Sequence, residues 1–326
     1  MQEEIKLKNI WNYHPNLPIK NSPVFSWPPK PKESFLHITK RWVTLTRFFA
    51  FVLLAIFIYN FLSPSFEVMK TFSLEWISYL FVRNTIILAI IAGSIHLYLY
   101  TFNSQENNFK FDKREFTKKN KTFTFNNQVY DNMFWSIFSG VTTWTMYECF
   151  YFWGVSNNYL STTSYADHPY QFIIWILILP FIRGVHFYLI HRLLHVPFLF
   201  KHVHKLHHRN INVGPWSGIS MHPVENLIYQ SSPLIHFVIP SDPMIFVFHI
   251  TYVCLNPAFT HAGFEKLVKN NSKILDAGDF HHQLHHRYYD CNYGNTDVPL
   301  DEWFGTFHDG TLESDKKMKE RRRKLS

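Results

Sequence analysis

Four long apolar runs constrain the fold of this chain more than any other feature of its 326 residues. Including the flanking positions, each run is long enough to cross the roughly 30 Å hydrocarbon core of a bilayer as a helix. In lipid, a helix satisfies all of its backbone hydrogen bonds within one segment. The sequence therefore predicts an all-α, integral-membrane helical bundle with about four spans. The four runs cover residues 48–62, 76–100, 133–153 and 170–190.

Two shorter apolar segments follow, at residues 227–238 and 244–255. The residues between them include Pro240, Asp242 and Pro243, which mark a turn by composition. Each segment alone is short for a membrane span. We expect a re-entrant or interfacial hairpin, with a buried soluble hairpin as the alternative.

The distribution of basic residues predicts the orientation of the spans. The loop at 102–132 is rich in lysine, whereas the loop at 154–170 contains neither lysine nor arginine. Basic loops stay on the cytoplasmic side of a membrane. The N-terminal segment, residues 1–40, is expected on the same side, either as a cytosolic arm or as a disordered tail. The fourth span then returns the chain to the cytoplasm.

Composition narrows the class of protein further. The net charge is +8 with neutral histidine, and the mean hydropathy is −0.12, which suits apolar spans combined with a polar part. Because the basic residues lie beside the spans, anionic lipid headgroups explain the charge better than nucleic acid does. The three cysteines are far apart and form no CxxC pair, so we expect neither a disulfide framework nor a thiolate metal site.

Histidines are the most informative residues for function, and fifteen of the twenty lie between His186 and His286. Three clusters are distinguished by their spacing: the first has the pattern HxxxH, and the other two have HxxHH. Their members are His191 and His195, then His204, His207 and His208, and finally His282, His285 and His286.

Each cluster presents its imidazoles to one side if the segment is helical, because residues three and four apart share a helix face. Pro197 is expected to end the first helix just after His195, which lets the chain turn toward the second cluster. Imidazole binds iron, zinc, copper and nickel. One closed tetrahedral site takes four ligands. Eight clustered histidines therefore predict a site for two metal ions.

The order of these motifs after membrane spans resembles the fatty acid hydroxylase superfamily, which includes sterol desaturases, sterol methyl oxidases and fatty acid hydroxylases. The resemblance covers about residues 178–310, and three further motifs support it. These are His222-Pro223-Val224-Glu225, Asn292-Tyr293-Gly294 and Trp303-Phe304-Gly305-Thr306.

The resemblance implies a helical membrane anchor beneath a cytosolic, histidine-rich helical cap that holds two irons, with zinc as a substitute metal. It also implies a multi-pass protein of the endoplasmic reticulum or a bacterial inner membrane. The expected parts are a cytosolic N-terminal arm (1–40), spans and loops (41–177), a fatty acid hydroxylase-like catalytic domain (178–310) and a basic C-terminal tail (311–326).

The family often has a further HxxxH box between the second and third clusters. Here His261 has Pro257 four residues before it and Glu265 four residues after it, so this box is incomplete. We expect His261 to be a ligand, with His222 supplying its partner. The metal ligands implied by the resemblance are then His191, His195, His204, His207, His208, His222, His261, His282, His285 and His286.

Metal-bound histidines usually donate their second ring N–H to a carboxylate or a carbonyl group. The candidate carboxylates are Glu225, Asp279 and Asp276, and Asp279 is also placed to cap the helix of the last cluster. Asn292 and Tyr293 are expected to line the site. The remaining histidines of the region are expected to be structural, interfacial or off the ligand face: His186, His202, His236, His249 and His281.

The resemblance implies an O2-dependent oxidoreductase that hydroxylates or desaturates a membrane lipid, either sterol-like or fatty-acyl. Unactivated C–H bonds require a metal that activates oxygen, because no amino-acid side chain attacks them. No haem or flavin motif is visible, so an external electron donor of the cytochrome b5 or ferredoxin type is expected. No catalytic residue beyond the metal ligands is assigned.

Two other classes remain open from the sequence. One is a non-enzymatic membrane protein that handles metals through a histidine-rich loop. The other is a zinc-dependent lipid hydrolase with Glu225 as the base, which needs an open metal position. Eight clustered histidines are more than a hydrolase of this kind requires.

Overall fold

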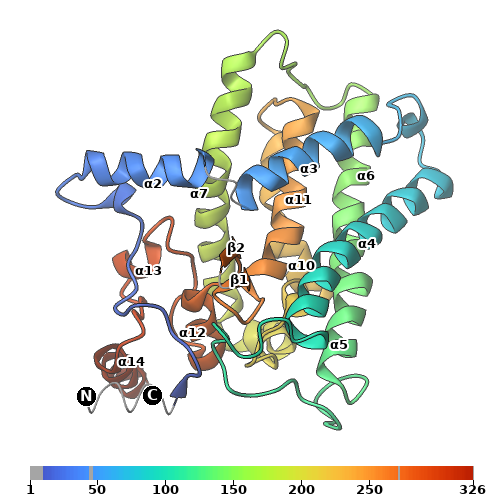
Figure 1. Cartoon of the computed structure of the whole chain (residues 1–326). Coiled ribbons are helices and arrows are strands. Elements are labelled where there is room, and N and C mark those ends of the chain that lie inside the picture. The colour runs from blue at the N-terminus through green and yellow to red at the C-terminus, as the bar shows by residue number, and fades with distance from the viewer. Residues whose placement is uncertain (1–9, 44–46, 271, 326) are drawn as a thin grey trace.

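The computed structural model describes residues 10–43, 47–270 and 272–325, and this part of the chain is mostly helical (Figure 1). The longer helices are α3 (Arg47–Phe61), α4 (Leu74–His96), α6 (Thr142–Ser156), α7 (Pro169–Leu194) and α11 (Pro243–Thr260). The shorter helices are α2 (Pro31–Val43), α5 (Gln128–Trp135), α8 (Pro197–Leu199), α9 (Lys205–His208), α10 (Pro223–Tyr229), α12 (Phe280–Tyr288), α13 (Leu300–Trp303) and α14 (Leu312–Leu325).

Three helical segments of the described chain are long and apolar enough to cross a membrane, judged by length and composition. They are α7, α11 and Leu74–Thr101, which is α4 extended by a π-helical turn. The second and fourth apolar runs of the sequence therefore lie in candidate spans. The first run lies in α3, whose 15 residues are only about 22 Å long. This helix is short for a span.

The third apolar run lies within a continuous helical stretch formed by α5, the π-helical segment Ser136–Val141 and α6. This stretch is not among the candidate spans. Its residues include Glu148 and several threonines and tyrosines, so it is less apolar than α7. The expected number of about four spans thus becomes three candidates in the described residues.

The predicted hairpin at 227–255 has one broken arm and one long arm. The first arm consists of α10 and a 3-10 helix, Ser232–Phe237. The second arm is α11, which has 18 residues and begins at the predicted turn, where Asp242 caps its N-terminus. The second arm is therefore longer than the sequence predicted. Its entry into a membrane stays a prediction.

Helix α11 forms the centre of the bundle. It is apolar around most of its circumference, as expected for a helix buried on all sides. It packs against α3, α4, α6 and α7, and α6, α7 and α11 stand roughly parallel in Figure 1. Aromatic pairs fill the contacts: Phe51 lies 5.5 Å from Tyr252, and Phe246 stacks on Tyr151 at 3.7 Å.

A buried ion pair joins α4 to α6. Nη2 of Arg83 donates to both carboxylate oxygens of Glu148, at 2.7 and 2.6 Å, and Asn84 donates to the same carboxylate. Both charged side chains are almost fully buried. Removing one partner of such a pair typically costs about 3–5 kcal/mol. This pair fixes the position of α6 beside α4.

A two-stranded antiparallel sheet corrects the all-α expectation. Strand β1 (Lys266–Lys269) pairs with β2 (Ser272–Asp276) directly after α11. The two strands have only four and five residues, and both carry lysine. Segments this short and polar have too little hydrophobic periodicity to be recognised as strands.

The N-terminal arm packs on the histidine-rich half of the molecule. Trp11 is 1% exposed and its ring lies 5.0 Å from that of Phe280 in α12. The backbone N–H of Ile19 donates to the carbonyl of Asp309. The part of the arm around Trp11 and Ile19 is therefore an ordered, docked part of the fold rather than a disordered tail.

Candidate metal centre

Four segments bring the predicted histidines together. Helix α7 supplies His191, and His195 is its C-cap residue. The following proline, Pro197, starts α8, so the predicted helix end is confirmed. A π-helical segment and α9 supply the second cluster, α12 supplies the third, and His261 is the C-cap of α11.

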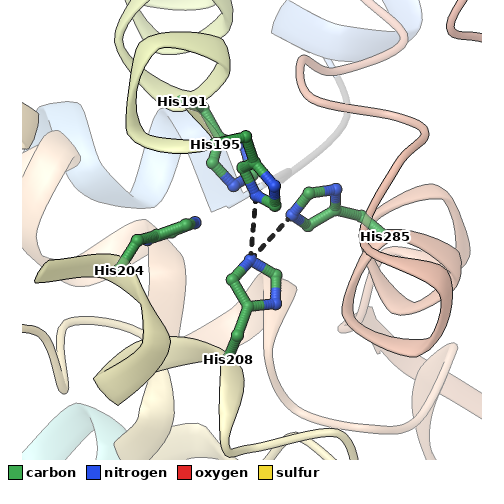
Figure 2. Close-up of side chains that lie close together, drawn as sticks. All are labelled: His191, His195, His204, His208 and His285. Atoms are coloured by element: carbon green, nitrogen blue, oxygen red, sulfur yellow. Dashed lines mark hydrogen bonds between the residues drawn. The ribbon is translucent and has the colours of Figure 1, made fainter. Parts of the chain in front are cut away.

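Five imidazoles form the first group, shown in Figure 2. One nitrogen of each ring lies within 4.8 Å of those of the others. Nε2 of His208 is 3.1 Å from Nε2 of His195 and 3.0 Å from Nε2 of His285. Three separate segments of the chain thus meet at one point. The members of the group are His191, His195, His204, His208 and His285.

Four buried imidazoles form the second group: His207, His261, His282 and His286. Three of their Nε2 atoms make a nearly equilateral triangle with sides of 3.1, 3.1 and 3.2 Å. Histidine nitrogens about 2.1 Å from one metal ion lie about 3.0–3.4 Å apart in octahedral or tetrahedral geometry. The triangle therefore has the size that a single ion requires.

The two groups adjoin. The ring of His208 in the first group is 4.8 Å from that of His286 in the second. His207 and His208 are neighbours in sequence but belong to different groups, so their rings diverge by 81°. One short helical turn thus contributes ligand atoms to both groups.

Backbone carbonyl groups fix the tautomers of several rings. Nδ1 of the ring donates to a carbonyl oxygen, which can only accept, so a neutral ring has its lone pair on Nε2. These Nε2 lone pairs point toward the group centres, where a cation removes the repulsion between them. The four pairs are His191 with Tyr293 (2.7 Å), His207 with Ser220 (3.4 Å), His261 with Pro257 (3.0 Å) and His285 with Cys291 (2.6 Å).

His204 uses a carboxylate for the same purpose. Its Nδ1 donates to Oε1 of Glu225 at 2.7 Å, and both side chains are almost fully buried. Nε2 of His204 is buried and has no hydrogen-bond partner. Glu225 thus fulfils the expectation of a carboxylate behind a histidine, and burial raises its pKa well above the usual value.

Burial also keeps the imidazoles neutral. It lowers the pKa of His207 to about 4, and neighbouring histidines further lower the pKa of His208, His282 and His285. A neutral imidazole has a lone pair for a metal, whereas a protonated one has none. The electrostatics of the site therefore suit metal binding at neutral pH.

His222 is the one predicted ligand that the structure does not bring into either group. It is the N-cap of α10, and its Nδ1 accepts a hydrogen bond of 3.2 Å from the backbone N–H of Val224. Its side chain is only partly buried. The ring therefore satisfies a helix terminus, and its expected partnership with His261 has no counterpart in the geometry.

The other expected residues have varied roles. Asp279 caps α12 as predicted, accepting from the backbone N–H of His281. Asp276 is exposed and pairs with Lys273. The Asn292 side chain bonds only backbone groups, which holds the loop after α12. The Tyr293 ring lies 4.9 Å from that of His195.

Asp301 was missed by the sequence reasoning. Its side chain accepts from the backbone N–H groups of Tyr293 and Gly294 at 2.8 and 2.7 Å, and also from the hydroxyl of Thr306. It therefore fixes the loop whose carbonyl group orients His191. No local pattern identifies such a residue, because its role depends on a loop closure.

A small cavity of about 50 Å³ adjoins both groups on the side of the long helices. His191 and His204 of the first group and His207, His261 and His282 of the second line it. Helices α7, α10 and α11 provide the rest of its wall, mostly with apolar side chains. A cavity of this size holds only a small group, so only the reacting part of a lipid-like ligand fits beside the imidazoles without movement of the walls.

A second hollow, the basic groove, has a volume of about 790 Å³ and reaches the first group from another side. Lys205, Arg209 and Arg322 line it, together with Tyr289, His195 and His208. The ring of Tyr289 lies 5.1 Å from that of His208. The first group is thus reached from a hollow with a basic lining.

A mostly helical chain with candidate membrane spans and two buried groups of imidazoles defines a membrane-associated, histidine-rich metal protein. Residues 172–306, which contain every member of both groups, match the family model for fatty acid hydroxylase. This region therefore belongs to the fatty acid hydroxylase superfamily.

The chain is similar to several sterol desaturases. It is 35% identical over 121 residues to the Delta(7)-sterol 5(6)-desaturase ERG3B of Gibberella zeae, covering 36% of this chain and 37% of that protein. It is 28% identical over 173 residues to the erg3C desaturase of Aspergillus fumigatus, covering 47% and 53%.

A further relative is a putative Delta(7)-sterol-C5(6)-desaturase of Arabidopsis thaliana, with 27% identity over 167 residues, covering 49% of this chain and 58% of the relative. The chain thus spans between about one third and just over half of the length of these relatives. No solved structure matches the chain.

Proposed function

We propose that this protein is an O2-dependent di-iron oxidoreductase that desaturates or hydroxylates a membrane lipid. The observation that carries the proposal is the convergence of nine imidazoles from distant segments into two adjoining groups. Both groups lie within the region that matches fatty acid hydroxylases. The ligands are the members of the two groups, and His222 is left out.

The donor set fits two iron ions. All nine donors are imidazoles, which suit iron and also zinc, so zinc is a plausible substitute during purification. The unpartnered Nε2 of His204 and the triangle of the second group are the features that a bound ion would explain. When bound, the irons supply the activation of O2.

Hydroxylation and desaturation each consume two electrons from an external donor. Hydroxylation converts R–H, O2, two electrons and two protons into R–OH and one water. Desaturation removes two hydrogens from adjacent carbons and, with O2, two electrons and two protons, releases two waters. The names of the relatives favour desaturation of a sterol. A fatty-acyl substrate remains the alternative.

The chain's own residues position the reacting groups. The cavity beside both groups places an apolar substrate next to the metal ligands and separates it from bulk water. Glu225 accepts the Nδ1 proton of His204 and so holds that ring with its Nε2 toward the group centre. The carbonyl groups of Tyr293 and Cys291 do the same for His191 and His285.

The proposed setting is a multi-pass membrane protein whose metal centre faces the cytosol. The candidate spans and the basic loop at 102–132 support this orientation through the distribution of positive charge. The membrane is either that of the endoplasmic reticulum or the inner membrane of a bacterium. The expected hairpin and the catalytic region at 178–310 are part of this proposal.

An acidic electron carrier of the cytochrome b5 or ferredoxin type would dock at the basic groove. Lys205 is exposed there and forms no ion pair with a described carboxylate. The groove reaches His195 and His208, so a carrier seated in it would lie within a few side chains of the metals. Complementary charge steers such encounters.

The two alternative classes have less support. A metal-handling loop would not need imidazoles fixed by buried carbonyl groups. A zinc hydrolase would use Glu225 as its base, but Oε1 of this carboxylate holds His204, and nine imidazoles are more than a hydrolase of this kind requires. Neither class explains two adjoining imidazole groups.

The test is metal content and turnover of the protein in nanodiscs. Two irons per chain, lost in a His204→Ala/His285→Ala variant, and O2-dependent conversion of a Δ7-sterol with a chemical reductant are the expected results. Substoichiometric metal that is unchanged in the variant would exclude the proposal.

A further inference from the structure

Arg183 is a charged residue in the cavity wall that the metal centre does not use. It lies on α7, two helical turns before His191, and lines the cavity with Phe187 and Tyr229. Its guanidinium lies over the rings of Phe187 and Tyr252, 5.8 and 5.2 Å from their centroids.

The guanidinium is incompletely paired. Its only hydrogen bond within the described part of the chain is a long one of 3.4 Å from Nη2 to the hydroxyl of Tyr229, and that hydroxyl itself donates to the carbonyl of Val253. Nε is buried and has no partner. No carboxylate among the described residues lies within ion-pair distance of Arg183, although Asp297 attracts it from farther away. A buried guanidinium without a directly bonded carboxylate is costly unless another acceptor completes it.

The other polar side chains of the cavity have partners, although Oε2 of Glu225 is buried and unpartnered. Asp279 caps α12, Glu225 holds His204, and Asn295 accepts from the backbone N–H of Asp297. Thr260 donates to the carbonyl of Pro257. Metal binding explains the free Nε2 of His204. The buried Nε of Arg183 is the donor that these roles leave unexplained.

We infer that Arg183 binds an oxygen acceptor of the lipid substrate, either a sterol hydroxyl or a carboxylate, and so selects which carbon reaches the metals. This inference rests on the proposed function. Arginine is suited to this role because it offers several fixed donors to one oxygen-bearing group. The apolar walls hold the hydrocarbon part of the same molecule.

The spacing limits where oxidation occurs. The guanidinium is 5.8 Å from the Phe187 ring, which is 4.9 Å from the His191 ring. A hydrogen bond from the guanidinium to the substrate oxygen spans about 3 Å. The oxidised carbon approaches its reaction partner at the metal centre to within about 3.5 Å. The bound oxygen and the oxidised carbon therefore belong to nearby parts of one molecule.

The test compares binding of matched probes to metal-loaded protein in nanodiscs without O2. The pairs are a Δ7-sterol and its 3-deoxy analogue, and palmitate and its methyl ester. The wild-type protein should bind the hydroxyl-bearing sterol or the carboxylate more tightly than its partner. Arg183→Met should weaken the binding of that preferred probe by roughly ten- to a hundredfold. The other probe of the pair, which lacks the hydroxyl or the charge, should bind to Arg183→Met and to the wild-type protein with equal affinity.

The preferred pair identifies the source of the oxygen. Equal weakening of both members of a pair would mean that Arg183 is structural, and no preference in wild type would also overturn the inference. Iron content of Arg183→Met reports on folding. Tyr229→Phe removes the long contact, together with the bond to the carbonyl of Val253, and should change binding less. Because binding is measured without turnover, failure of this inference is distinguishable from failure of the proposed reaction.

Discussion

Nε2 of His208 lies 3.0 Å from Nε2 of His285, although 77 residues separate them in the chain. Nε2 of His208 is also 3.1 Å from that of His195. These contacts join α9, α12 and the end of α7 at one point. The first group therefore exists only when the whole histidine-rich half is folded.

We expect His208→Ala to lose at least one iron per chain and all turnover, because this ring lies between ligands from two other segments. The measurement is elemental analysis beside oxygen consumption. His202→Ala is the matched control, since His202 is an exposed histidine six residues away that packs on Phe198. Retention of full iron by the His208 variant would remove this ring from the ligand set.

His222→Ala should keep both metals, because His222 caps α10 and lies outside both groups. Loss of the cap should lower the free energy of unfolding by about 1 kcal/mol. His261→Ala, by contrast, should lose metal from the second group. Thermal unfolding and metal analysis of the two variants distinguish these roles, and metal loss in His222→Ala would restore the ligand interpretation from the sequence.

Helical spacing was sufficient to predict most of the site. The i, i+3 and i, i+4 pattern identifies eight of the nine grouped histidines, because residues on one helix face point the same way. His261 was added through the resemblance, and so was His222, which lies outside both groups. The position of a single histidine outside such a pattern depends on where the fold takes its segment, which the local sequence does not show. His261 ends α11 beside α12, whereas His222 begins α10.

The carbonyl groups of Tyr293 and Cys291 could not be predicted from the sequence, because every residue has one and only the fold aims it. The same holds for Asp301, whose contacts depend on a closed loop. Hydropathy identified α7 and α4 correctly. Hydropathy underestimated the length of α11. The turn at Pro240 and Pro243 predicts a hairpin, but it does not show how long the second arm is.

Glu225→Gln should weaken metal binding by about ten- to a hundredfold, because an amide can orient His204 but stabilises its bound form less than a carboxylate. The measurement is the metal affinity by competition with a chelator. Glu265→Gln is a control of the same chemistry outside both groups, where Glu265 accepts from Tyr13. An unchanged affinity in Glu225→Gln would show that this carboxylate is only structural.

Acid should release the metals and destabilise the metal-free protein. The pKa of His207 is about 4 in the folded chain, against about 6.5 when unfolded. Between these values, the unfolded state binds more protons, so the free energy of unfolding falls as pH drops from about 6.5 toward 4. Metal content and thermal unfolding between pH 7.5 and 5 test this. Stability that rises on acidification would contradict neutral buried rings.

Lys205→Glu should slow electron delivery from an acidic protein donor by about tenfold at low salt, because it reverses a charge in the basic groove. The difference should shrink as ionic strength rises. Reduction by dithionite, which needs no docking surface, should be unchanged. Lys273→Glu is the control, because Lys273 lies on β2, outside the groove, and pairs with Asp276. If both variants accept electrons at the wild-type rate, the donor docks elsewhere, and the groove then has another role, such as admitting O2 or water to the first group.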